Sequence, residues 1–273
     1  MSVFRTRFAP SPTYFLHLGH ALSAFHVWRA ADAAGGEVLL RIEDIDTTRC
    51  RPEYSDAIFE DLRWLGFEWP EPVRTQSAHF GAYDACVEKL NDMGLAYRCF
   101  RTRAQLAALE DPLRPGPLRD DEQAKLLEQG APFAWRLSLR RAREHLGGLY
   151  DQLSFQEITP GGQITRDADP DQHGDIVIAR KDSPSAYHIA ATHDDALQEM
   201  THIIRGEDLI DAPHIHTLLQ VLMDWPQPIY QHHGLLLDDD GNKLSKRQES
   251  ISLASLRADG MTADQIRARL GFA

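Results

Sequence analysis

A chain of 273 residues, 42% of them hydrophobic, can bury a full core in one large or two modest domains. No apolar run is long enough to span a bilayer and the mean hydropathy is −0.40, so we expect neither a membrane protein nor a signal peptide. Three scattered cysteines exclude a disulfide framework and favour a reducing cytoplasm. The net charge of −12 leaves nucleic-acid binding undecided, because a local basic patch is enough for phosphate contacts.

The first elements expected are a short strand at 3–8, a proline-containing loop, and a helix that begins at His-Leu-Gly-His, residues 17–20. This order forms a common phosphate-binding layout, because free backbone N–H groups and the positive end of the helix dipole face the anion. As an isolated four-residue match, His-Leu-Gly-His is weak evidence, and its position after a strand and loop strengthens it.

The next elements alternate regularly. Residues 37–42 form an almost continuous apolar strand, and an acidic cluster at 43–47 follows at its carboxyl end, where ligands bind in open α/β sheets. An ordinary solvated loop is the alternative for that cluster. Helices are predicted over 52–66 and 79–93, followed by a strand at 97–100. This alternation predicts an α/β protein with a parallel, doubly wound sheet.

From 102 to 171 the composition changes, and we interpret this segment as an insertion. It contains Pro/Gly-rich stretches, a short helix predicted at 120–129 and a strand-like run at 133–139. Its most basic part either faces RNA or is a solvated helix face, and the sequence leaves both open. The arginines concerned are Arg136, Arg140, Arg141 and Arg143.

Buried strands are then expected at 174–179, 185–191 and 201–205, with a short helix that starts near Asp194 between the last two. A helix over 211–223 and a strand over 229–237 follow. The chain continues through a polar turn into Lys-Leu-Ser-Lys-Arg at 243–247 and ends in small amphipathic helices.

Five motifs in order carry a resemblance to a known family. His-Leu-Gly-His at 17–20 and Lys-Leu-Ser-Lys-Arg at 243–247 match the two signatures of class I aminoacyl-tRNA synthetases. Arg-Thr-Arg-Phe-Ala-Pro-Ser-Pro-Thr at 5–13, Leu-Leu-Arg-Ile-Glu-Asp-Ile-Asp at 39–46 and Ile-Ile-Arg-Gly-Glu-Asp-Leu at 203–209 narrow the match to the glutamyl family. The chain therefore resembles glutamyl-tRNA synthetases over almost its whole length.

This resemblance implies a Rossmann-like doubly wound parallel sheet with an inserted α+β subdomain and a short helical C-terminal segment. The catalytic domain would comprise 1–101 and 172–237, separated by an acceptor-binding-like insertion at 102–171. The lysine-containing loop and final helices would occupy 238–273. Because the sequence stops soon after that loop, we expect no anticodon-binding domain. The chain thus resembles short members of the family that attach glutamate to queuosine in the anticodon of tRNA(Asp).

The resemblance also implies the chemistry. A glutamate carboxylate attacks the α-phosphate of ATP, bound with Mg²⁺, and gives glutamyl-adenylate and pyrophosphate, so the protein must position the reactants and neutralise phosphate charge. It assigns catalysis to His17, His20, Lys243 and Lys246, and ATP binding to His17, Gly19, His20 and Lys246. A lysine on a mobile loop suits this role because its compact charge can follow the leaving pyrophosphate.

Glutamate carries two carboxylates and one ammonium, which sets the chemistry of its pocket. Arg7 and Arg205 can each bind a carboxylate through two hydrogen bonds, and Glu43 can bind the ammonium. Which arginine takes which carboxylate stays open. Tyr187 either adds a hydroxyl donor or is a packed aromatic residue. A surface ion pair is the alternative for the arginines, but such pairs contribute little energy. The pocket loop would add Phe8, Ala9, Pro10 and Ser11.

Three positions depart from the family pattern. Cys99 keeps one ligand of the structural zinc site found in many relatives, but Arg101 replaces the second cysteine, so we expect no zinc. Tyr14 replaces a glycine and either stacks on a neighbour or partly fills the pocket. Ala191 replaces an asparagine of the glutamate pocket. We interpret the remaining histidine pairs as core or surface residues without a metal: His214, His216, His232 and His233.

The expected protein is therefore a monomeric cytoplasmic ligase whose partners are L-glutamate, ATP and the queuosine-carrying anticodon stem-loop of tRNA(Asp). Two alternatives stay open. One is a short ligase that acts on tRNA(Glu) or another acceptor. The other is a catalytically idle module that binds glutamate or a nucleotide, which Tyr14 keeps under consideration.

Overall fold

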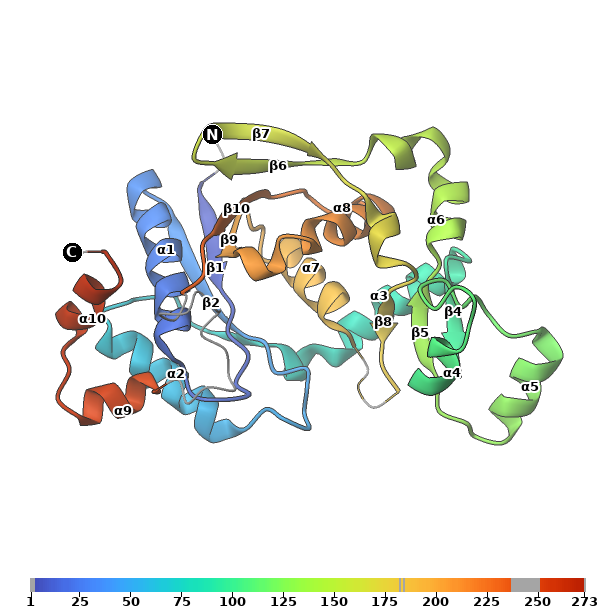
Figure 1. Ribbon diagram of the computed structural model, residues 1–273, viewed down its shortest axis with the longest axis horizontal. Helices are drawn as coiled ribbons and strands as arrows, with labels where there is room; N and C mark the ends of the chain where they lie inside the picture. Colours follow the sequence, from blue (N-terminus) through green and yellow to red (C-terminus); the bar gives the residue numbers. More distant parts are fainter. Residues whose placement is uncertain (1–2, 182, 184, 237–250, 273) are drawn as a thin grey trace.

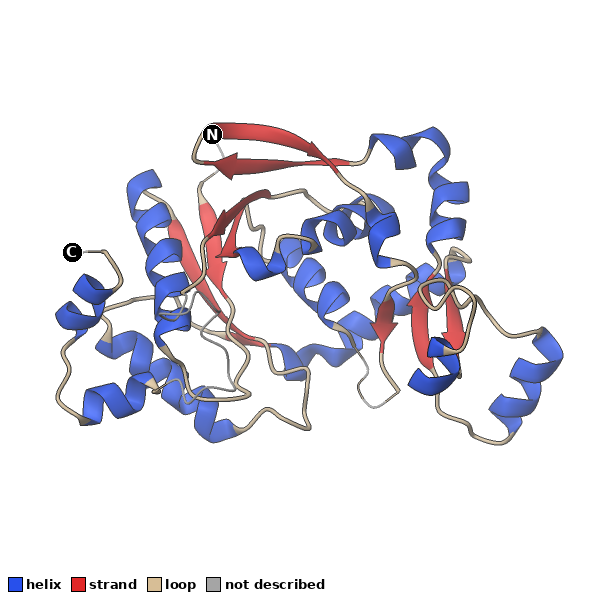
Figure 2. Ribbon diagram, viewed as in Figure 1, coloured by secondary structure: helices blue, strands red, loops and turns tan. Residues whose placement is uncertain are grey.

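A parallel sheet with helices on both faces organises the larger part of the molecule (Figures 1 and 2). The structure is a computed structural model that describes residues 3–181, 183, 185–236 and 251–272. Its first elements confirm the predicted order: β1 is Arg5–Phe8, α1 is Leu18–Ala34 and β2 is Glu37–Ile42. Gly35 ends α1 with a φ of 60°, and a Cβ on Gly36 would lie 2.3 Å from the Phe4 carbonyl oxygen, so this helix stop requires both glycines.

Two hydrogen-bonded groups of strands lie edge to edge in this sheet. The first runs β1, β2 and β3, and the second runs β9, β10, β6 and β7, with only the β6–β7 hairpin antiparallel. Next to the two edges, the Thr201 N–H donates to the Arg5 carbonyl at 2.9 Å and the Arg5 N–H donates to Thr201 Oγ1 at 2.8 Å. The added strands are β3 (Arg74–Thr75), β6 (Ser154–Thr159), β7 (Gly162–Asp167), β9 (His202–Gly206) and β10 (Ile229–His233).

Alternation along the strands divides the sheet into an apolar face and a charged face. Val38, Leu40 and Ile42 of β2 belong to the apolar cluster that includes the buried side of α1. Because side chains alternate between faces along a strand, Arg41 lies on the other face, where it meets α7 (Tyr187–Leu197). The sheet is therefore covered on both faces, as the apolar run predicted.

A second, smaller sheet corrects two expectations. The strands predicted at 97–100 and 174–179 form β4 and β8, and both pair antiparallel with β5, away from the main sheet. Conversely, the β6–β7 hairpin from the predicted insertion joins the main sheet beside β10. The order of elements along the chain does not show which strands pair. The division at 102–171 stays a prediction. The bounds are β4 Ala96–Cys99, β5 Ala134–Leu137 and β8 Val177–Ala179.

The strand predicted at 185–191 is wrong. These residues form the start of α7, so the helix begins at Tyr187 instead of near Asp194. A short apolar run reads the same as a buried strand or a buried helix, and here alanine, the residue with the highest helix propensity, favours the helix. As a result, Asp194 and Asp195 lie within the helix and are buried.

The remaining helices follow the predicted positions, with two short additions in the insertion, α4 and α6. No helix in the described ranges is long and apolar enough to cross a membrane. The bounds are α2 Pro52–Trp64, α3 Phe80–Asp92, α4 Arg103–Ala107, α5 Asp120–Glu128, α6 Leu139–Leu146, α8 Ala212–Met223, α9 Leu253–Ala258 and α10 Ala263–Arg269.

One buried carboxyl group lies where α2 packs against the C-terminal helices. Asp61 is 0% exposed, and neither carboxylate oxygen has a hydrogen-bond partner in the described structure. Arg257 of α9 approaches at 3.6 Å and lies closer, at 2.9 Å, to Glu60. Burial outweighs this attraction and raises the pKa of Asp61 to about 6.

This group should make the stability fall as the pH rises. The folded pKa of about 6 lies above the ordinary value of 3.8, so the folded state binds the proton more tightly, and the penalty grows from about pH 4 to pH 6. The difference in unfolding free energy between Asp61→Asn and the parent protein should therefore shift by about 3 kcal/mol in favour of the variant when the pH is raised from about 4 to about 8. Urea unfolding at both pH values measures this difference. Glu60→Gln, which removes an exposed carboxylate beside the same arginine, should show less than about 1 kcal/mol.

Candidate active site

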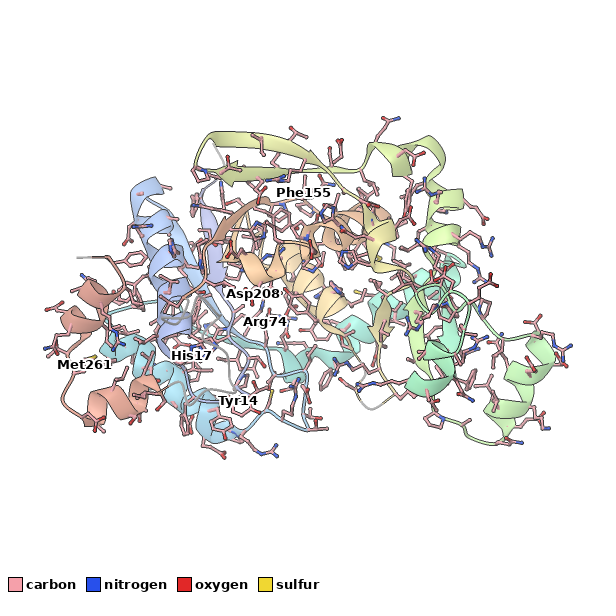
Figure 3. All side chains as sticks on the ribbon, in the orientation of Figure 1. Tyr14, His17, Arg74, Phe155, Asp208 and Met261 are labelled. Carbon is pink, nitrogen blue, oxygen red and sulfur yellow. The ribbon has the colours of Figure 1, made fainter. Side chains whose placement is uncertain are left out.

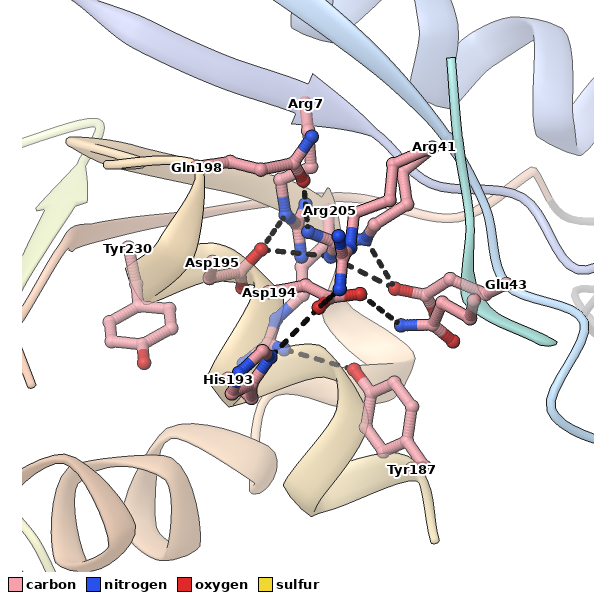
Figure 4. Close-up of polar contacts among 12 residues, drawn as sticks. Arg7, Arg41, Glu43, Tyr187, His193, Asp194, Asp195, Gln198, Arg205 and Tyr230 are labelled. Carbon is pink, nitrogen blue, oxygen red and sulfur yellow. Dashed lines mark hydrogen bonds and ion pairs between the residues drawn. The ribbon is translucent and has the colours of Figure 1, made fainter. Parts of the chain in front are cut away.

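Three arginines from three strands lie on the charged face of the main sheet. Arg7 of β1, Arg41 of β2 and Arg205 of β9 are 6%, 0% and 5% exposed. Arginine is almost never buried to this degree without partners. The strands bring the three guanidinium groups to the same region, next to α7 (Figure 4).

Asp195 of α7 is the shared partner of two of these arginines. Its Oδ1 accepts hydrogen bonds from Arg7 Nε at 2.9 Å and from Arg41 Nη2 at 2.8 Å (Figure 4). Burial opposes ionisation of this carboxyl, but Arg7 and Arg41 hold the pKa of Asp195 below its ordinary value. Arg41 Nη2 also donates to Glu43 Oε1 at 2.9 Å. Asp195 therefore fixes the positions of Arg7 and Arg41, and Arg41 in turn fixes Glu43.

Asp194, the preceding residue, anchors a second buried network. It accepts hydrogen bonds from Tyr83 Oη at 2.8 Å and Gln76 Nε2 at 3.1 Å, and it pairs with Arg74 Nη2 at 2.9 Å. His193 Nδ1 lies 2.9 Å from Asp194 Oδ1, the oxygen that also pairs with Arg74. These partners outweigh burial and hold the pKa of Asp194 well below its ordinary value. Neither aspartate was predicted from the sequence as a site residue.

A cavity of about 150 Å³ opens beside the arginine cluster. Three predicted glutamate-binding residues, Ser11, Glu43 and Tyr187, are among the residues that line it. The Glu43 N–H donates to the Pro10 carbonyl at 3.0 Å, which ties the loop after β1 to the acidic loop after β2. The other lining residues are Ile45, Asp46, Arg49, Gln76, Arg180, Ser183 and Ser185.

Arg205 has an incomplete set of partners. Its Nη1 lies 3.4 Å from the Tyr187 hydroxyl and its Nε donates to His232 Nε2 at 3.3 Å. Its Nη2 is buried and has no hydrogen-bond partner among the described residues. Because an unsatisfied buried donor is costly, this N–H group marks a position for an acceptor such as a carboxylate. Burial raises the pKa of Tyr187, so its hydroxyl remains a donor at neutral pH.

The predicted glutamate-binding residues at the end of β1 and in the loop that follows differ in their burial and in the face they occupy. The Phe8 ring packs against Trp28 in the apolar core, with ring centroids 5.9 Å apart, and so lies on the opposite face from Arg7. Its predicted role in glutamate binding is therefore restricted to backbone atoms. Ala9 is half-buried and Pro10 is buried. Their contacts with glutamate stay a prediction.

The predicted nucleotide-binding residues form a helix cap. His17 is the N-cap of α1: its Nδ1 accepts the Gly19 N–H at 3.0 Å, and His20 Nδ1 accepts the His17 N–H at 3.1 Å. The two rings lie 3.9 Å apart, centroid to centroid. A Cβ on Gly19 would lie 2.9 Å from His17 Cε1, so this arrangement requires glycine there. The caps orient both imidazoles at a helix N-terminus, where anions bind.

The predicted catalytic lysines, Lys243 and Lys246, lie outside the described residues. The chain after that segment returns directly to the helix cap. Ser252 forms a β-bridge with His17, and the Leu253 N–H donates to the Leu16 carbonyl at 2.8 Å. The C-terminal part of the chain therefore contacts the predicted nucleotide-binding residues.

Tyr14 lies at the surface and does not line the cavity. Tyr14, labelled in Figure 3, is 52% exposed, and its φ is negative. Its ring stacks on Tyr54 with centroids 6.3 Å apart. Of the two alternatives left by the sequence, the structure supports stacking on a neighbour. Ala191 is buried within α7.

The predicted zinc region holds a different set of contacts. Cys99 is buried on β4, and the Arg101 guanidinium donates to the Gly116 carbonyl at 2.8 Å. Within the described ranges no group of three or more histidine, cysteine or acidic side chains is placed to bind a metal. Whether the chain binds zinc stays a prediction. Among the histidines, His214 Nδ1 accepts the Asp169 N–H at 2.8 Å and His216 is buried.

The basic stretch of the insertion is engaged within the chain. Arg140 pairs with Glu144 at 2.6 Å, and Arg143 pairs with Asp151 and Asp171. Arg136 and Arg141 donate to backbone carbonyls of Asp175, and of Gly94 and Ala96, respectively. Arg140 and Arg143 nevertheless stay 68% and 44% exposed, so the choice between an RNA-facing surface and a solvated helix face remains a prediction.

Comparison with known proteins agrees with this geometry. The chain belongs to the family of class I tRNA synthetases (E and Q), whose catalytic-domain model matches residues 3–270. Among its relatives, a glutamyl-Q tRNA(Asp) synthetase from Rhodobacter capsulatus is 39% identical over 98% of this chain and 99% of its own length. Another from Symbiobacterium thermophilum is 34% identical over 97% of this chain and 85% of its own length.

The fold is likewise similar to that of solved synthetases. A crystal structure of a glutamate tRNA ligase from Elizabethkingia meningosepticum, in complex with its amino acid, superposes with a TM-score of 0.73 at 30% sequence identity. The match covers 95% of this chain and 54% of the ligase, so the chain spans about half the length of that enzyme. The predicted Rossmann-like α/β class is confirmed.

Proposed function

We propose that this chain activates L-glutamate with ATP to form glutamyl-adenylate and then transfers the glutamyl group to queuosine in the anticodon of tRNA(Asp). The observation that carries the first step is the buried Arg205 Nη2, which has no hydrogen-bond partner among the described residues and lies close to the cavity that Glu43 and Tyr187 line. The likeness to two glutamyl-Q tRNA(Asp) synthetases over nearly the full chain supports the acceptor.

The described residues match the charges of glutamate. Arg7 and Arg205 bind the two carboxylates, and Glu43 binds the ammonium at the wall of the cavity. Tyr187 donates its hydroxyl, and Ser11 adds a polar group from the β1 loop. Arg41 already pairs with Glu43 and Asp195, so it does not bind the substrate and instead fixes the positions of these two carboxylates.

The helix cap serves the nucleotide. His17, Gly19 and His20 at the N-terminus of α1 contact the phosphates of ATP, which binds with Mg²⁺. A glutamate carboxylate oxygen attacks the α-phosphorus and pyrophosphate leaves. Lys243 and Lys246, as predicted from the sequence, neutralise the charge that develops on pyrophosphate. In the second step a nucleophile of queuosine attacks the activated carbonyl carbon and AMP leaves.

The three cysteines of the chain are unpaired thiols, which supports the cytoplasm as its location. A monomer is our prediction for the oligomeric state. Sedimentation analysis of the purified chain measures that state directly.

The function is tested by two assays on the purified chain. With glutamate and ATP, isotope exchange between pyrophosphate and ATP should proceed without tRNA. Glutamate should then transfer to queuosine-containing tRNA(Asp) and not to the same tRNA without queuosine. Transfer to tRNA(Glu) would identify the alternative ligase, and no exchange with or without tRNA would identify the idle binding module. Aspartate and glutamine in place of glutamate are the matched substrate controls.

A further inference from the structure

A chain of side-chain contacts connects Arg205 of β9 to the β6–β7 hairpin through His232 of β10. Arg205 Nε lies 3.3 Å from His232 Nε2, and His232 Nδ1 lies 2.7 Å from Glu157 Oε1. The other carboxylate oxygen, Oε2, pairs with Arg166 of β7. The β-sheet register explains the contacts: His232 of β10 lies opposite Arg205 of β9, and Tyr230, two residues earlier, lies opposite Glu157 of β6. Figure 1 shows the hairpin beside β10.

The contacts define which imidazole nitrogen carries the proton. A guanidinium group can only donate, so His232 Nε2 must accept and the ring proton lies on Nδ1, which donates to Glu157. The side chains of His232 and Glu157 are 5% and 4% exposed, so bulk water does not compete for these hydrogen bonds. Burial and the charge of Arg205 lower the pKa of His232, although Glu157 opposes this, so the imidazole is neutral.

This chain of contacts holds one nitrogen of the Arg205 guanidinium, and Tyr187 of α7 holds a second. Nε is fixed by His232 and Nη1 by Tyr187, while Nη2 keeps no partner in the described part of the chain. A long side chain loses rotational freedom when it binds, and prior fixing reduces that loss. The same contacts also fix the plane of the guanidinium, which a carboxylate must match to form two hydrogen bonds.

We propose that Glu157 and His232 are positioning residues that orient Arg205 to bind a carboxylate of the substrate, so that the β6–β7 hairpin sets the affinity for glutamate. This inference rests on the proposed function. It assigns a role in substrate binding to residue 157, which belongs to the segment predicted as an insertion. Arg166, 47% exposed on β7, completes the connection to the protein surface.

Paired substitutions of each residue test the proposal. His232→Leu removes both hydrogen bonds, whereas in His232→Gln an amide oxygen can still accept from Arg205. Glu157→Ala removes the acceptor for Nδ1–H, whereas Glu157→Gln retains one. The disruptive variants should raise the KM for glutamate about tenfold, the value of one hydrogen bond to a charged group, and leave the KM for ATP unchanged. The conservative variants should recover most of the affinity.

His233→Gln is the matched control, because His233 is also buried on β10 but stacks on His26, with ring centroids 4.5 Å apart. Its KM for glutamate should stay at the parent value. Circular dichroism and thermal unfolding identify any variant that has lost the fold. An equal rise in both KM values, or an unchanged KM for glutamate in folded His232→Leu and Glu157→Ala, would overturn the proposal.

A measurement on the parent protein separates this proposal from the function itself. ¹⁵N NMR of histidine-labelled protein, with His232→Gln for assignment, should show Nδ1 protonated and Nε2 unprotonated at neutral pH. A doubly protonated ring or a proton on Nε2 would overturn the proposed orientation, whatever the enzyme assays show. If the parent protein gives no exchange with glutamate while the NMR result holds, the proposed function fails and the orientation of Arg205 remains.

Discussion

Arg205→Ala should raise the KM for glutamate about 100-fold, since loss of a buried, charge-assisted pair costs about 3 kcal/mol. The guanidinium is 5% exposed and already fixed through Nε and Nη1, so little freedom is lost when Nη2 binds a carboxylate. The KM for ATP should stay within about twofold of the parent value, because the helix cap at His17 lies on other elements. Steady-state pyrophosphate exchange with each substrate varied in turn measures both constants.

The matched control for this substitution is Arg5→Ala. Arg5 is also on the main sheet, but it pairs with Glu37 and Glu199, which do not line the cavity, whereas Arg205 contacts the lining residue Tyr187. Its removal should leave the KM for glutamate unchanged. A parent-like KM for glutamate in Arg205→Ala would show that this arginine does not bind the substrate.

Asp195→Asn should lower the free energy of unfolding by about 3–5 kcal/mol, because it removes the charge that compensates two buried guanidinium groups. Arg7 and Arg41 both donate to the same oxygen, Oδ1, and Arg41 is 0% exposed. Arg41 keeps Glu43 as a partner, so the larger part of the loss falls on Arg7. Urea unfolding, followed by circular dichroism, gives the free energy directly.

Glu199→Gln is the control for the charge change. Its carboxylate, 80% exposed, pairs with Arg5 at the surface, where an ion pair contributes less than about 1 kcal/mol. If Asp195→Asn is as stable as this control, the buried arginines are compensated by groups other than Asp195.

Local patterns in the sequence predicted most elements of the fold. The apolar run at 37–42 and the glycines after α1 define their strand and helix end through neighbours in the chain. Strand pairing is a different matter, because it depends on residues far apart. The local pattern does not show that β4 pairs antiparallel with β5, nor that β6 lies beside β10. The error at 185–191 has a similar cause, since burial on all sides removes the periodicity that separates a helix from a strand.

The candidate site was predictable where a motif carried it. Glu43 and Ser11 line one cavity, and Tyr187, which also lines it, contacts Arg205. Arg41 was missed because it lies in an apolar run, where the residue types on both sides indicate only a buried strand. An arginine inside such a run nonetheless indicates a buried ion pair, because a buried guanidinium group needs a carboxylate partner.

The partner itself could not be found from the sequence. Asp195 is separated from Arg41 by 154 residues and from Arg7 by 188, and the helix that carries it was placed too late in the chain. Two adjacent aspartates near a predicted helix start resemble an ordinary N-terminal cap. Only the fold shows that Asp195 anchors Arg7 and Arg41 and that Asp194 anchors Arg74.

The long separation in sequence between the first strands and α7 has a consequence for the biosynthesis of the protein. A ribosome adds about 5–20 residues per second, so Arg41 would precede Asp195, 154 residues later, by roughly eight to thirty seconds. During that time Arg41, which is buried in the folded protein, has no Asp195 to pair with. The edge of the sheet at β1 likewise lacks the neighbouring segment at Thr201. The N-terminal half should therefore remain dependent on chaperones until α7 is made. A ribosome-bound chain that ends before α7 should be protease-sensitive, and one that extends past β10 should not.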